Sequence, residues 1–430
     1  MKVMIVGGGG REHAIAMSVA KSERVEKIYC LPGNAGIEAV AQCVPIGPME
    51  FEKIRDFAKE QKIDLAVIGM DDPLVGGLTD ILEAEGIRTF GPRKNAAILE
   101  GSKAFSKDLM KKYQIPTAAY ENFDNADVGL CYLERASYPI VLKADGLALG
   151  KGVLICKSFE EAKAGVKEIM LDKKFGASGN TMVVEEFMTG REVSVLSFVD
   201  GKTVKTMTSA QDHKRAKDGD EGPNTGGMGT YSPSLVFDKE LEERIRREIL
   251  EPTLKGFQED GLDFKGVLFI GLMITKDGPK VIEFNNRFGD PEAQSVLMRL
   301  DSDLADIFTA VTENRLSETE MKWSDKQAVC GVLASGGYPG SYEKGKEITG
   351  LDKVDEDVVV FHAGTASDHI CDASSCRSAI VTSGGRVLGV TAVGATHEEA
   401  RQKAFDNVKR ISFEGMQYRN DIGLIRSDLL

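Results

Sequence analysis

The first 92 residues alternate between short apolar segments and amphipathic segments, and this alternation constrains the fold more than any other feature of the chain. Strands are predicted at KVMIV, KIYCL, DLAVIG and RTFG, and helices at REHAIAMSVAKS, FEKIRDFAKEQ and PLVGGLTDILEAEG. A βαβαβαβ order requires a parallel sheet with right-handed crossovers. Ligands of such sheets bind beyond the carboxyl ends of the strands, so a site is expected among the loops Gly7–Arg11, Pro32–Ala35 and Gly69–Pro73.

The glycine-rich loop after the first strand predicts an anion site rather than a dinucleotide site. In VGGGGRE the third glycine of G-x-G-x-x-G would fall on Glu12, and the second strand ends in LPGN, without an acidic residue for a ribose hydroxyl. A nicotinamide or flavin cofactor is therefore not expected. A glycine-rich turn that opens a helix still binds anions through free N–H groups and the helix dipole, and Arg11 adds positive charge. Tight packing of the strand against the helix is the alternative explanation of these glycines.

After residue 92 the pattern changes to that of an α+β body followed by a mostly β domain. A helix is predicted at 101–116, and apolar strand-like segments predominate from 139 to 285. The last hundred residues, from 327, are rich in strands and glycine. Further helices are expected at 158–170, 238–260, 292–316 and 397–410.

A second glycine-rich loop, KADGLALGKGV, lies between the strand-like segments IVLK and VLIC. It departs from the Walker A pattern, because three residues separate Gly146 from Gly150 and Gly152 stands where a Ser or Thr is required. A strand–loop–strand hairpin can instead cover a triphosphate like a flap, with backbone N–H groups on the phosphate oxygens. Lys143 and Lys151 would add charge. Such a loop brings no metal ligand, so the ligand must come from elsewhere.

The segment KVIEFNNRFGDPE is the candidate source of metal ligands. Glu283 and Asn285 are two positions apart in a predicted strand, so both side chains project from one face. A carboxylate and an amide oxygen suit magnesium, a hard cation that prefers oxygen ligands. The alternative is a solvated strand face. Arg287, Asp290 and Glu292 follow at once, and so dense a set of charges is costly to bury without partners.

Charge and hydropathy exclude several classes of function. The net charge of −13 comes without a concentrated basic patch, so no nucleic-acid partner is expected. No apolar run is long enough to span a membrane, and the amino-terminal apolar run breaks into glycines rather than a signal-peptide cleavage site. A cytoplasmic protein without a membrane partner is expected.

Eight ordered motifs resemble the phosphoribosylamine–glycine ligase (glycinamide ribonucleotide synthetase) family of the ATP-grasp superfamily, and they cover the chain from end to end. They are GGREHA (9–14), PGNAG (32–36), LEGSKAF (99–105), KADGLALGKGV (143–153), QDHKR (211–215), GPNTGGMG (222–229), RFGDPEAQ (287–294) and FHAGT (361–365). The resemblance implies an α/β and α+β multidomain protein. Its expected parts are a Rossmann-like domain with a parallel sheet (1–100), an ATP-grasp domain (101–325) with a flap subdomain at about 120–190, and a β-rich domain (326–430).

The resemblance also implies roles for individual residues. The catalytic residues would be Arg287, Lys143 and Asp290, with Arg287 on the glycine carboxylate or the transferring phosphoryl group, and the metal ligands would be Glu283 and Asn285. ATP would be bound by Lys103, Lys143, Asp145, Gly146, Gly150, Lys151, Gly152, Glu185, Glu186, Phe187, Met188 and Glu192. The substrate-binding residues would be Gly9, Gly10, Arg11, Glu12, His13, Asp212, Lys214, Asn224, Thr225, Gly226, Gly227, Asp290, Pro291 and Glu292.

The activity implied is an ATP-dependent ligation of glycine to 5-phosphoribosylamine through glycyl phosphate, with Mg²⁺ or Mn²⁺ as cofactor. The protein is expected to be a monomer or a weak homo-oligomer. Three alternatives are a related ATP-grasp enzyme that uses formate or bicarbonate, a nucleotide-cofactor dehydrogenase, and a non-catalytic nucleotide sensor. RFGDPE and FHAGT speak against the first, and the missing dinucleotide marks speak against the second. The metal pair and the lysines speak against the third.

Two positions depart from the family pattern. The third strand ends in GMDDPL where the family usually has G-P-E-x-P-L, so Met70 and Asp71 put one contact to the amine substrate in doubt. Asn286 stands where the family often has cysteine, which argues against an essential thiol there.

Overall fold

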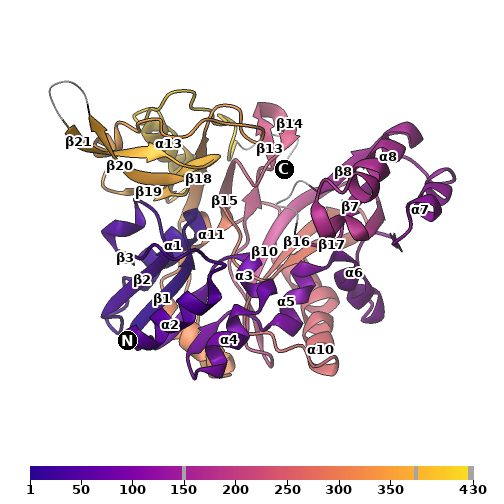
Figure 1. Cartoon of the computed structure of the whole chain (residues 1–430), viewed down its shortest axis with the longest axis horizontal. Helices are drawn as coiled ribbons and strands as arrows, with labels where there is room; N and C mark the ends of the chain where they lie inside the picture. Colours follow the sequence, from indigo (N-terminus) through magenta and orange to yellow (C-terminus); the bar gives the residue numbers. More distant parts are fainter. Residues whose placement is uncertain (148–151, 372–375, 425–430) are drawn as a thin grey trace.

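The computed structural model describes residues 1–147, 152–371 and 376–424. Three parts are distinct in Figure 1: an amino-terminal domain, a central body from which a subdomain projects, and a carboxyl-terminal part stacked over the amino-terminal domain. Each has its own buried core, and the projecting subdomain has another.

The amino-terminal domain is the predicted parallel sheet, which the strand order β3-β2-β1-β4-β5 confirms. Alternate residues of β1 enter two cores. Val3 and Ile5 pack on the side of α1, while Met4 and Val6 pack on the side of α2 and α4. The strands are β1 Lys2–Gly7, β2 Lys27–Pro32, β3 Gln42–Cys43, β4 Leu65–Ile68 and β5 Arg88–Phe90, and the helices are α1 Gly10–Val19, α2 Phe51–Gln61, α3 Asp71–Gly76 and α4 Leu78–Ala84.

Two helical predictions in the first 120 residues are wrong in detail. The single helix expected over PLVGGLTDILEAEG is two helices, α3 and α4, because Gly77 adopts a left-handed conformation (φ 91°) that an α-helix cannot continue through. The helix predicted at 101–116 is α6 Lys103–Lys112, which is shorter than predicted, and α5 Lys94–Gly101 was not predicted. Ser102 separates them and caps α6 by accepting the Phe105 N–H.

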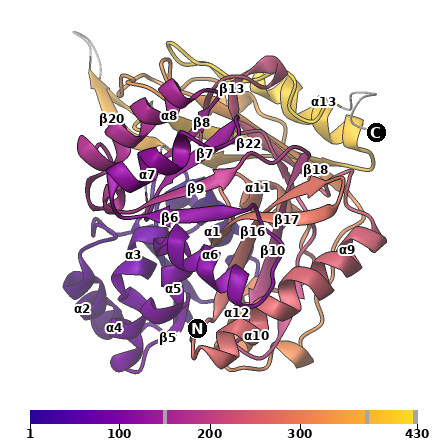
Figure 2. The same ribbon diagram turned by 90° about the vertical axis from the view of Figure 1, so that its right-hand side faces the viewer.

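The central body contains two antiparallel sheets that face each other (Figure 2). The larger has the order β11-β10-β16-β17 and the smaller, in the projecting subdomain, has the order β6-β9-β7-β8. Strands β7 and β8 pair antiparallel, which confirms the predicted hairpin around the second glycine-rich loop. The strands are β6 Tyr120–Phe123, β7 Ile140–Ala144, β8 Val153–Cys156, β9 Met182–Glu186, β10 Arg191–Val199, β11 Val204–Thr206, β16 Gly266–Thr275 and β17 Gly278–Asn285. The helices are α7 Ala126–Leu133, α8 Phe159–Val166, α9 Lys239–Ile245, α10 Glu251–Glu259, α11 Glu292–Val296 and α12 Leu304–Thr312.

The carboxyl-terminal sheet has the order β12-β15-β18-β22-β19, so two strands from the central segment complete it. The sequence does not predict that β12 and β15 join this sheet, because they are far from β18 along the chain. Helix α13 His397–Val408 packs on β18 and β22, and β20–β21 forms a separate hairpin. The strands are β12 Gln211–Asp212, β13 Arg215–Lys217, β14 Glu221–Asn224, β15 Gly229–Ser232, β18 Gln327–Ala334, β19 Val358–His362, β20 Thr365–Cys371, β21 Cys376–Thr382 and β22 Arg386–Gly394.

The amino- and carboxyl-terminal domains meet at a buried histidine pair. The His362 N–H donates to His13 Nδ1 at 2.8 Å, and Asn34 Nδ2 donates to the carbonyls of Gly8 (2.9 Å) and His362 (2.8 Å). Burial, and then the neighbouring His362, lowers the pKa of His13 to about 3, and burial lowers the pKa of His362 to about 4. Both rings are therefore neutral in the folded protein at neutral pH.

This pair predicts a loss of stability on acidification. Because both folded pKa values lie below the unfolded value of 6.5, the unfolded chain binds the protons more readily, and stability is lost as the pH falls below 6.5. Each histidine should cost about 2 kcal/mol between pH 6.5 and 5. Thermal denaturation at several pH values measures this loss. His13→Asn keeps an acceptor for the His362 N–H but cannot titrate, so its melting temperature should vary less over this range. An unchanged pH dependence in that variant would contradict the assignment.

Candidate active site

Strand β17 presents the two predicted metal ligands at the centre of the molecule. Glu283 and Asn285 are half-buried on one face of the strand, while Phe284 is buried on the other. Within the described residues no hydrogen bond or salt bridge satisfies the Glu283 carboxylate. Burial alone would raise the pKa of Glu283, but the positive charges of Lys214, Lys143, Lys103 and Arg287 outweigh it and the pKa is lowered. The carboxylate is thus ionised and open to a ligand.

These residues fit a divalent metal ion that shares its coordination with phosphate. A carboxylate and an amide oxygen on one face are hard ligands of the kind that Mg²⁺ and Mn²⁺ accept. In the described part of the chain, no group of three or more His, Cys, Asp or Glu side chains could hold a metal ion without further ligands. Magnesium is commonly held by one or two protein carboxylates together with substrate phosphates.

Arg287 follows β17, the strand that carries Glu283 and Asn285 and is called the metal strand below, and forms a salt bridge with Glu100 of α5. Its Nη2 lies 3.0 Å from Glu100 Oε1 and 3.3 Å from Asn285 Oδ1. Glu100 is buried, and this burial raises its pKa to about 7, although Arg287 acts in the opposite direction. The Asn286 N–H donates to Glu100 Oε2 at 2.7 Å, and Asn286 Nδ2 donates to the carbonyl of Ala97 at 2.7 Å. Asn286 is thus a buried side chain that binds backbone, in keeping with the argument against a thiol there.

Two lysines predicted to bind ATP lie near the metal face. Lys103 Nζ donates to the carbonyl of Gly146 at 2.6 Å, and Lys143 Nζ lies 2.8 Å from Glu185 Oε1. The structure adds Lys107, whose Nζ is 3.0 Å from Glu185 Oε2. Lys107, Lys143 and Glu185 are all buried, so one carboxylate balances two ammonium groups. Lys107 was not predicted, because an isolated lysine on an amphipathic helix normally faces solvent.

The base of the glycine-rich hairpin is anchored to the start of α6. Asp145 accepts hydrogen bonds from Ser102 Oγ (3.1 Å) and the Ala104 N–H (3.0 Å), and Gly146 has a φ of 99° that favours glycine. The Ala144 N–H donates to the carbonyl of Gly152 at 2.9 Å. The predicted residues Gly150 and Lys151 lie outside the described residues.

The predicted adenine segment follows β9 on the rim of the smaller sheet. Glu186 Oε1 lies 3.2 Å from Lys280 Nζ, and the Phe187 side chain is exposed. Met188 is half-buried, and the turn it begins leads into β10 and Glu192. Glu192 Oε2 lies 3.3 Å from Lys214 Nζ, so two residues predicted for different substrates form one ion pair.

The first glycine-rich loop joins the amino-terminal domain to the end of the metal strand. The Gly9 N–H donates to Glu12 Oε2 and Arg11 Nε donates to Glu12 Oε1, both at 2.7 Å. Arg11 Nη1 donates to the carbonyl of Phe288 at 3.0 Å. A side chain on Gly9 would approach Asp290 Oδ2, and one on Gly10 would collide with Gln294. The predicted anion loop therefore lies against RFGDPE, as its expected role requires.

A second group of predicted residues lies beside Asp290. A side chain on Gly227 would collide with both Pro291 and Asp212. Burial, followed by the nearby Glu292, raises the pKa of Asp212 well above its usual range. Glu292 Oε1 accepts a hydrogen bond from Ser194 Oγ at 2.9 Å.

Two side chains of the carboxyl-terminal domain reach this group and were missing from the prediction. Arg386 Nη1 donates to the carbonyls of Gly226 (2.7 Å) and Asp290 (2.6 Å), and Tyr338 Oη accepts from the Gly226 N–H at 2.9 Å. Thr225 is tied to the carbonyl of Lys214 through its N–H and its hydroxyl, whereas Asn224 is exposed on β14. Arg386 stands in a glycine-rich stretch, GGRVLG, that gives no functional signal without the fold.

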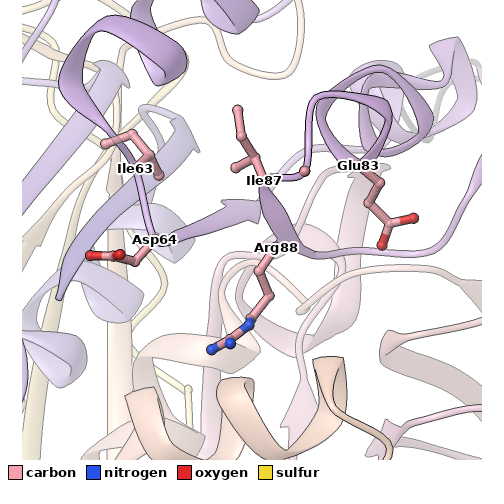
Figure 3. Close-up of a pocket in the computed structure, with 6 residues that line it drawn as sticks. Ile63, Asp64, Glu83, Ile87 and Arg88 are labelled. Carbon is pink, nitrogen blue, oxygen red and sulfur yellow. The ribbon is translucent and has the colours of Figure 1, made fainter.

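Two surface hollows lie away from this site. One, of about 380 Å³, is lined by Ile63, Asp64, Glu83, Gly86, Ile87 and Arg88 at the amino ends of β4 and β5 (Figure 3). The other, of about 480 Å³, lies on the projecting subdomain between residues 124–127 and 170–180. The first hollow lies at the amino ends of its strands and Gly7–Arg11 at the carboxyl end of β1, so the two are at opposite edges of the sheet. Parallel sheets bind ligands at the carboxyl ends of their strands.

Two antiparallel sheets, a glycine-rich hairpin, buried lysines and a carboxylate–amide pair on β17, the edge strand of one sheet, define an ATP-grasp protein. Family models of phosphoribosylglycinamide synthetase match the whole of this arrangement: the N domain at residues 1–100, the ATP-grasp (A) domain at 101–293 and the C domain at 328–425.

Curated relatives and solved structures agree with this match. The phosphoribosylamine–glycine ligases of Caldanaerobacter subterraneus and Brucella melitensis are each 49% identical, over 98% of this chain and 99% and 97% of theirs. The crystal structure of phosphoribosylamine–glycine ligase from Thermotoga maritima has a TM-score of 0.83 at 34% identity, covering 98% of this chain and 100% of that one. A biotin carboxylase from Campylobacter jejuni (TM-score 0.73, 14% identity, 98% of this chain and 94% of that one) shares the fold.

The chain belongs to the phosphoribosylamine–glycine ligase family. It is accordingly an ATP-grasp carbon–nitrogen ligase, of a family that uses ATP and a divalent metal ion. None of the helices in the described ranges is long and apolar enough to cross a membrane.

Proposed function

We propose that this protein joins glycine to 5-phosphoribosylamine, with ATP as phosphoryl donor, to give glycinamide ribonucleotide, ADP and phosphate. The observation that supports the proposal is the contact between the Gly9–Arg11 loop and RFGDPE, in which Arg11 Nη1 donates to the carbonyl of Phe288. A sugar phosphate on this loop would lie beside the end of β17, the strand that carries Glu283 and Asn285. Full-length similarity to relatives named for this reaction supports the same substrates.

The first step is phosphoryl transfer. An oxygen of the glycine carboxylate attacks the γ-phosphorus of ATP, the bond from that phosphorus to the bridging oxygen breaks, and ADP leaves with the electron pair. Lys103, Lys143 and Arg287 supply fixed positive charge around the transferring group. Glu283 and Asn285 would hold Mg²⁺ or Mn²⁺, which when bound neutralises phosphate charge.

The second step forms the carbon–nitrogen bond. The amine of 5-phosphoribosylamine attacks the acyl carbon of glycyl phosphate, inorganic phosphate leaves, and the nitrogen loses a proton. Gly9, Gly10, Arg11 and His13 would hold the sugar phosphate, and Asp290 to Glu292 with Asp212 would lie beside the amine. The hairpin from Asp145 to Gly152 would close over the phosphates and exclude water, because an acyl phosphate hydrolyses readily.

We also propose the nucleoside contacts, the domain limits and the assembly of the protein. Glu185 to Met188 and Glu192 would contact the nucleoside, although Glu185 also balances Lys143 and Lys107. The domains would divide at about residues 100 and 325, with the flap subdomain at about 120–190. We further propose a cytoplasmic enzyme that is a monomer or a weak homo-oligomer, with Mg²⁺ as the usual metal.

ADP release measured with ATP, Mg²⁺ and glycine, with and without phosphoribosylamine made in situ, tests this function. We expect ADP release that requires both glycine and the amine, and none when formate or bicarbonate replaces glycine. ADP release that is independent of glycine would show that the carboxylate substrate is not glycine. No release under any condition would favour a nucleotide sensor.

A further inference from the structure

Glu100 makes two buried contacts with the segment that follows the metal strand. It lies near the end of α5, its side chain is almost completely buried, and its two oxygens have different partners. Oε2 accepts the Asn286 N–H at 2.7 Å, and Oε1 lies 3.0 Å from Arg287 Nη2. One carboxylate therefore fixes both the backbone and the guanidinium immediately after Asn285.

The other contacts of Arg287 leave Glu100 as its acidic partner within the described residues. Nη2 also donates to Asn285 Oδ1 at 3.3 Å, and Nη1 donates to the carbonyl of Phe288 at 3.2 Å. Nε is buried and has no hydrogen-bond partner in the described part of the chain. The two Nη atoms are thus held by protein groups, while the buried Nε is a donor that none of the described groups accepts.

A second acidic residue, Glu283, lies on the strand that Arg287 follows. Among the described residues Glu283 forms no salt bridge with Arg287, whereas Glu100 Oε1 lies 3.0 Å from Arg287 Nη2. A direct pair of Arg287 with Glu283 would occupy both groups, so the pair with Glu100 leaves the Glu283 carboxylate open to a metal ion.

Glu100 also has a firm support of its own. It belongs to helix α5, Lys94–Gly101, in which Ala96, Ala97 and Leu99 are also buried. A side chain on a packed helix is positioned more precisely than one on a loop, so Glu100 can hold the guanidinium in one orientation.

We propose that Glu100 is a positioning residue for the acyl-phosphate step: it holds the Arg287 guanidinium toward the substrate carboxylate and away from Glu283. The inference rests on the proposed function, in which that carboxylate belongs to glycine. No sequence motif assigns Glu100 such a role, because its partner lies nearly two hundred residues further along the chain.

Glu100→Gln tests this role, because glutamine offers one acceptor oxygen where glutamate offers two. We expect the KM for glycine to rise by about tenfold to hundredfold, with the KM for ATP changed by less than about twofold. Glu100→Asp keeps the charge on a shorter arm and should show an intermediate rise. Asn286→Cys is the matched control: it removes the link to Ala97 but leaves Glu100 and Arg287, and it should keep the glycine KM of the unaltered protein.

A double-mutant cycle with Arg287→Lys separates positioning from a general structural effect. If Glu100 acts through Arg287, adding Glu100→Gln to Arg287→Lys should change the glycine KM by less than about twofold. Thermal denaturation of each variant identifies those that fold, and Glu100→Asp replaces Glu100→Gln in the cycle if the latter does not.

The inference is overturned by an unchanged glycine KM in folded Glu100→Gln or Glu100→Asp. It is also overturned if the rise is fully additive with Arg287→Lys, or if Asn286→Cys produces the same rise. These outcomes differ from failure of the proposed function, in which the unaltered protein itself releases ADP without needing glycine.

Discussion

Replacing Glu283 by glutamine is expected to lower kcat by about a thousandfold while the fold stays intact. Glutamine keeps the size of the side chain but removes the negative charge that four cations surround. The loss corresponds to about 4 kcal/mol of transition-state stabilisation, within the range that metal-ion catalysis supplies. ADP release under saturating substrates measures kcat, and thermal denaturation measures the fold.

The metal dependence of the same variant gives a second readout. Half-maximal activity should require a higher Mg²⁺ concentration than in the unaltered protein, because one of two protein ligands is weakened. Asp277→Asn is the matched control, since Asp277 is exposed in the turn between β16 and β17. Unchanged turnover in Glu283→Gln would remove Glu283 from the metal site.

Replacing Lys143 by methionine is expected to lower kcat/KM for ATP by about a hundredfold. Lys143 is a buried ammonium on β7, a strand of the glycine-rich hairpin, and its charge lowers the pKa of Glu283. Removing one fixed donor from a charged transition state commonly costs this much. Methionine fills a similar volume, so the measured loss reports charge rather than a cavity. Initial rates over a range of ATP concentrations give the value.

Lys107→Met is the matched control for Lys143→Met. Both lysines are buried and pair with the two oxygens of Glu185, at 3.0 Å for Lys107 and 2.8 Å for Lys143. Lys107 belongs to α6 and its Nζ also donates to Thr117 Oγ1 at 2.8 Å, whereas Lys143 belongs to β7 of the hairpin. Both variants should lose stability, but Lys107→Met should keep kcat/KM for ATP within about threefold. Equal kinetic losses in the two variants would show that Lys143 acts only by balancing Glu185.

Much of the fold follows from periodicity within the sequence. The alternation over the first 92 residues predicted the parallel sheet, because strands that are joined by helices pair in parallel. The split at Gly77 was missed, since a glycine within a helical pattern is tolerated more often than it ends a helix. The paired sheets of the central body were less predictable, because antiparallel strands choose partners by tertiary contacts.

The candidate site was predictable where its residues lie within a few positions of one another. Glu283 and Asn285 share a face because they are two apart in a strand, and Gly9 to Arg11 form one loop. Tyr338, Arg386 and Glu100 were not found, because each acts on a segment far from it in sequence. Alternating apolar and polar residues show that a side chain is buried, but they do not name its partner.

Residue types and their local spacing can be read directly from the chain: the glycine loops, the lysines, and the carboxylate and amide of β17. Which of these residues meet depends on how the distant segments pack. Glu100 and Asn286 are 186 positions apart and His13 and His362 are 349 apart, yet both pairs are hydrogen-bonded. Local preferences act over a few residues, whereas burying three domains against one another selects contacts between distant segments. Burial of charge then requires a specific partner for each group.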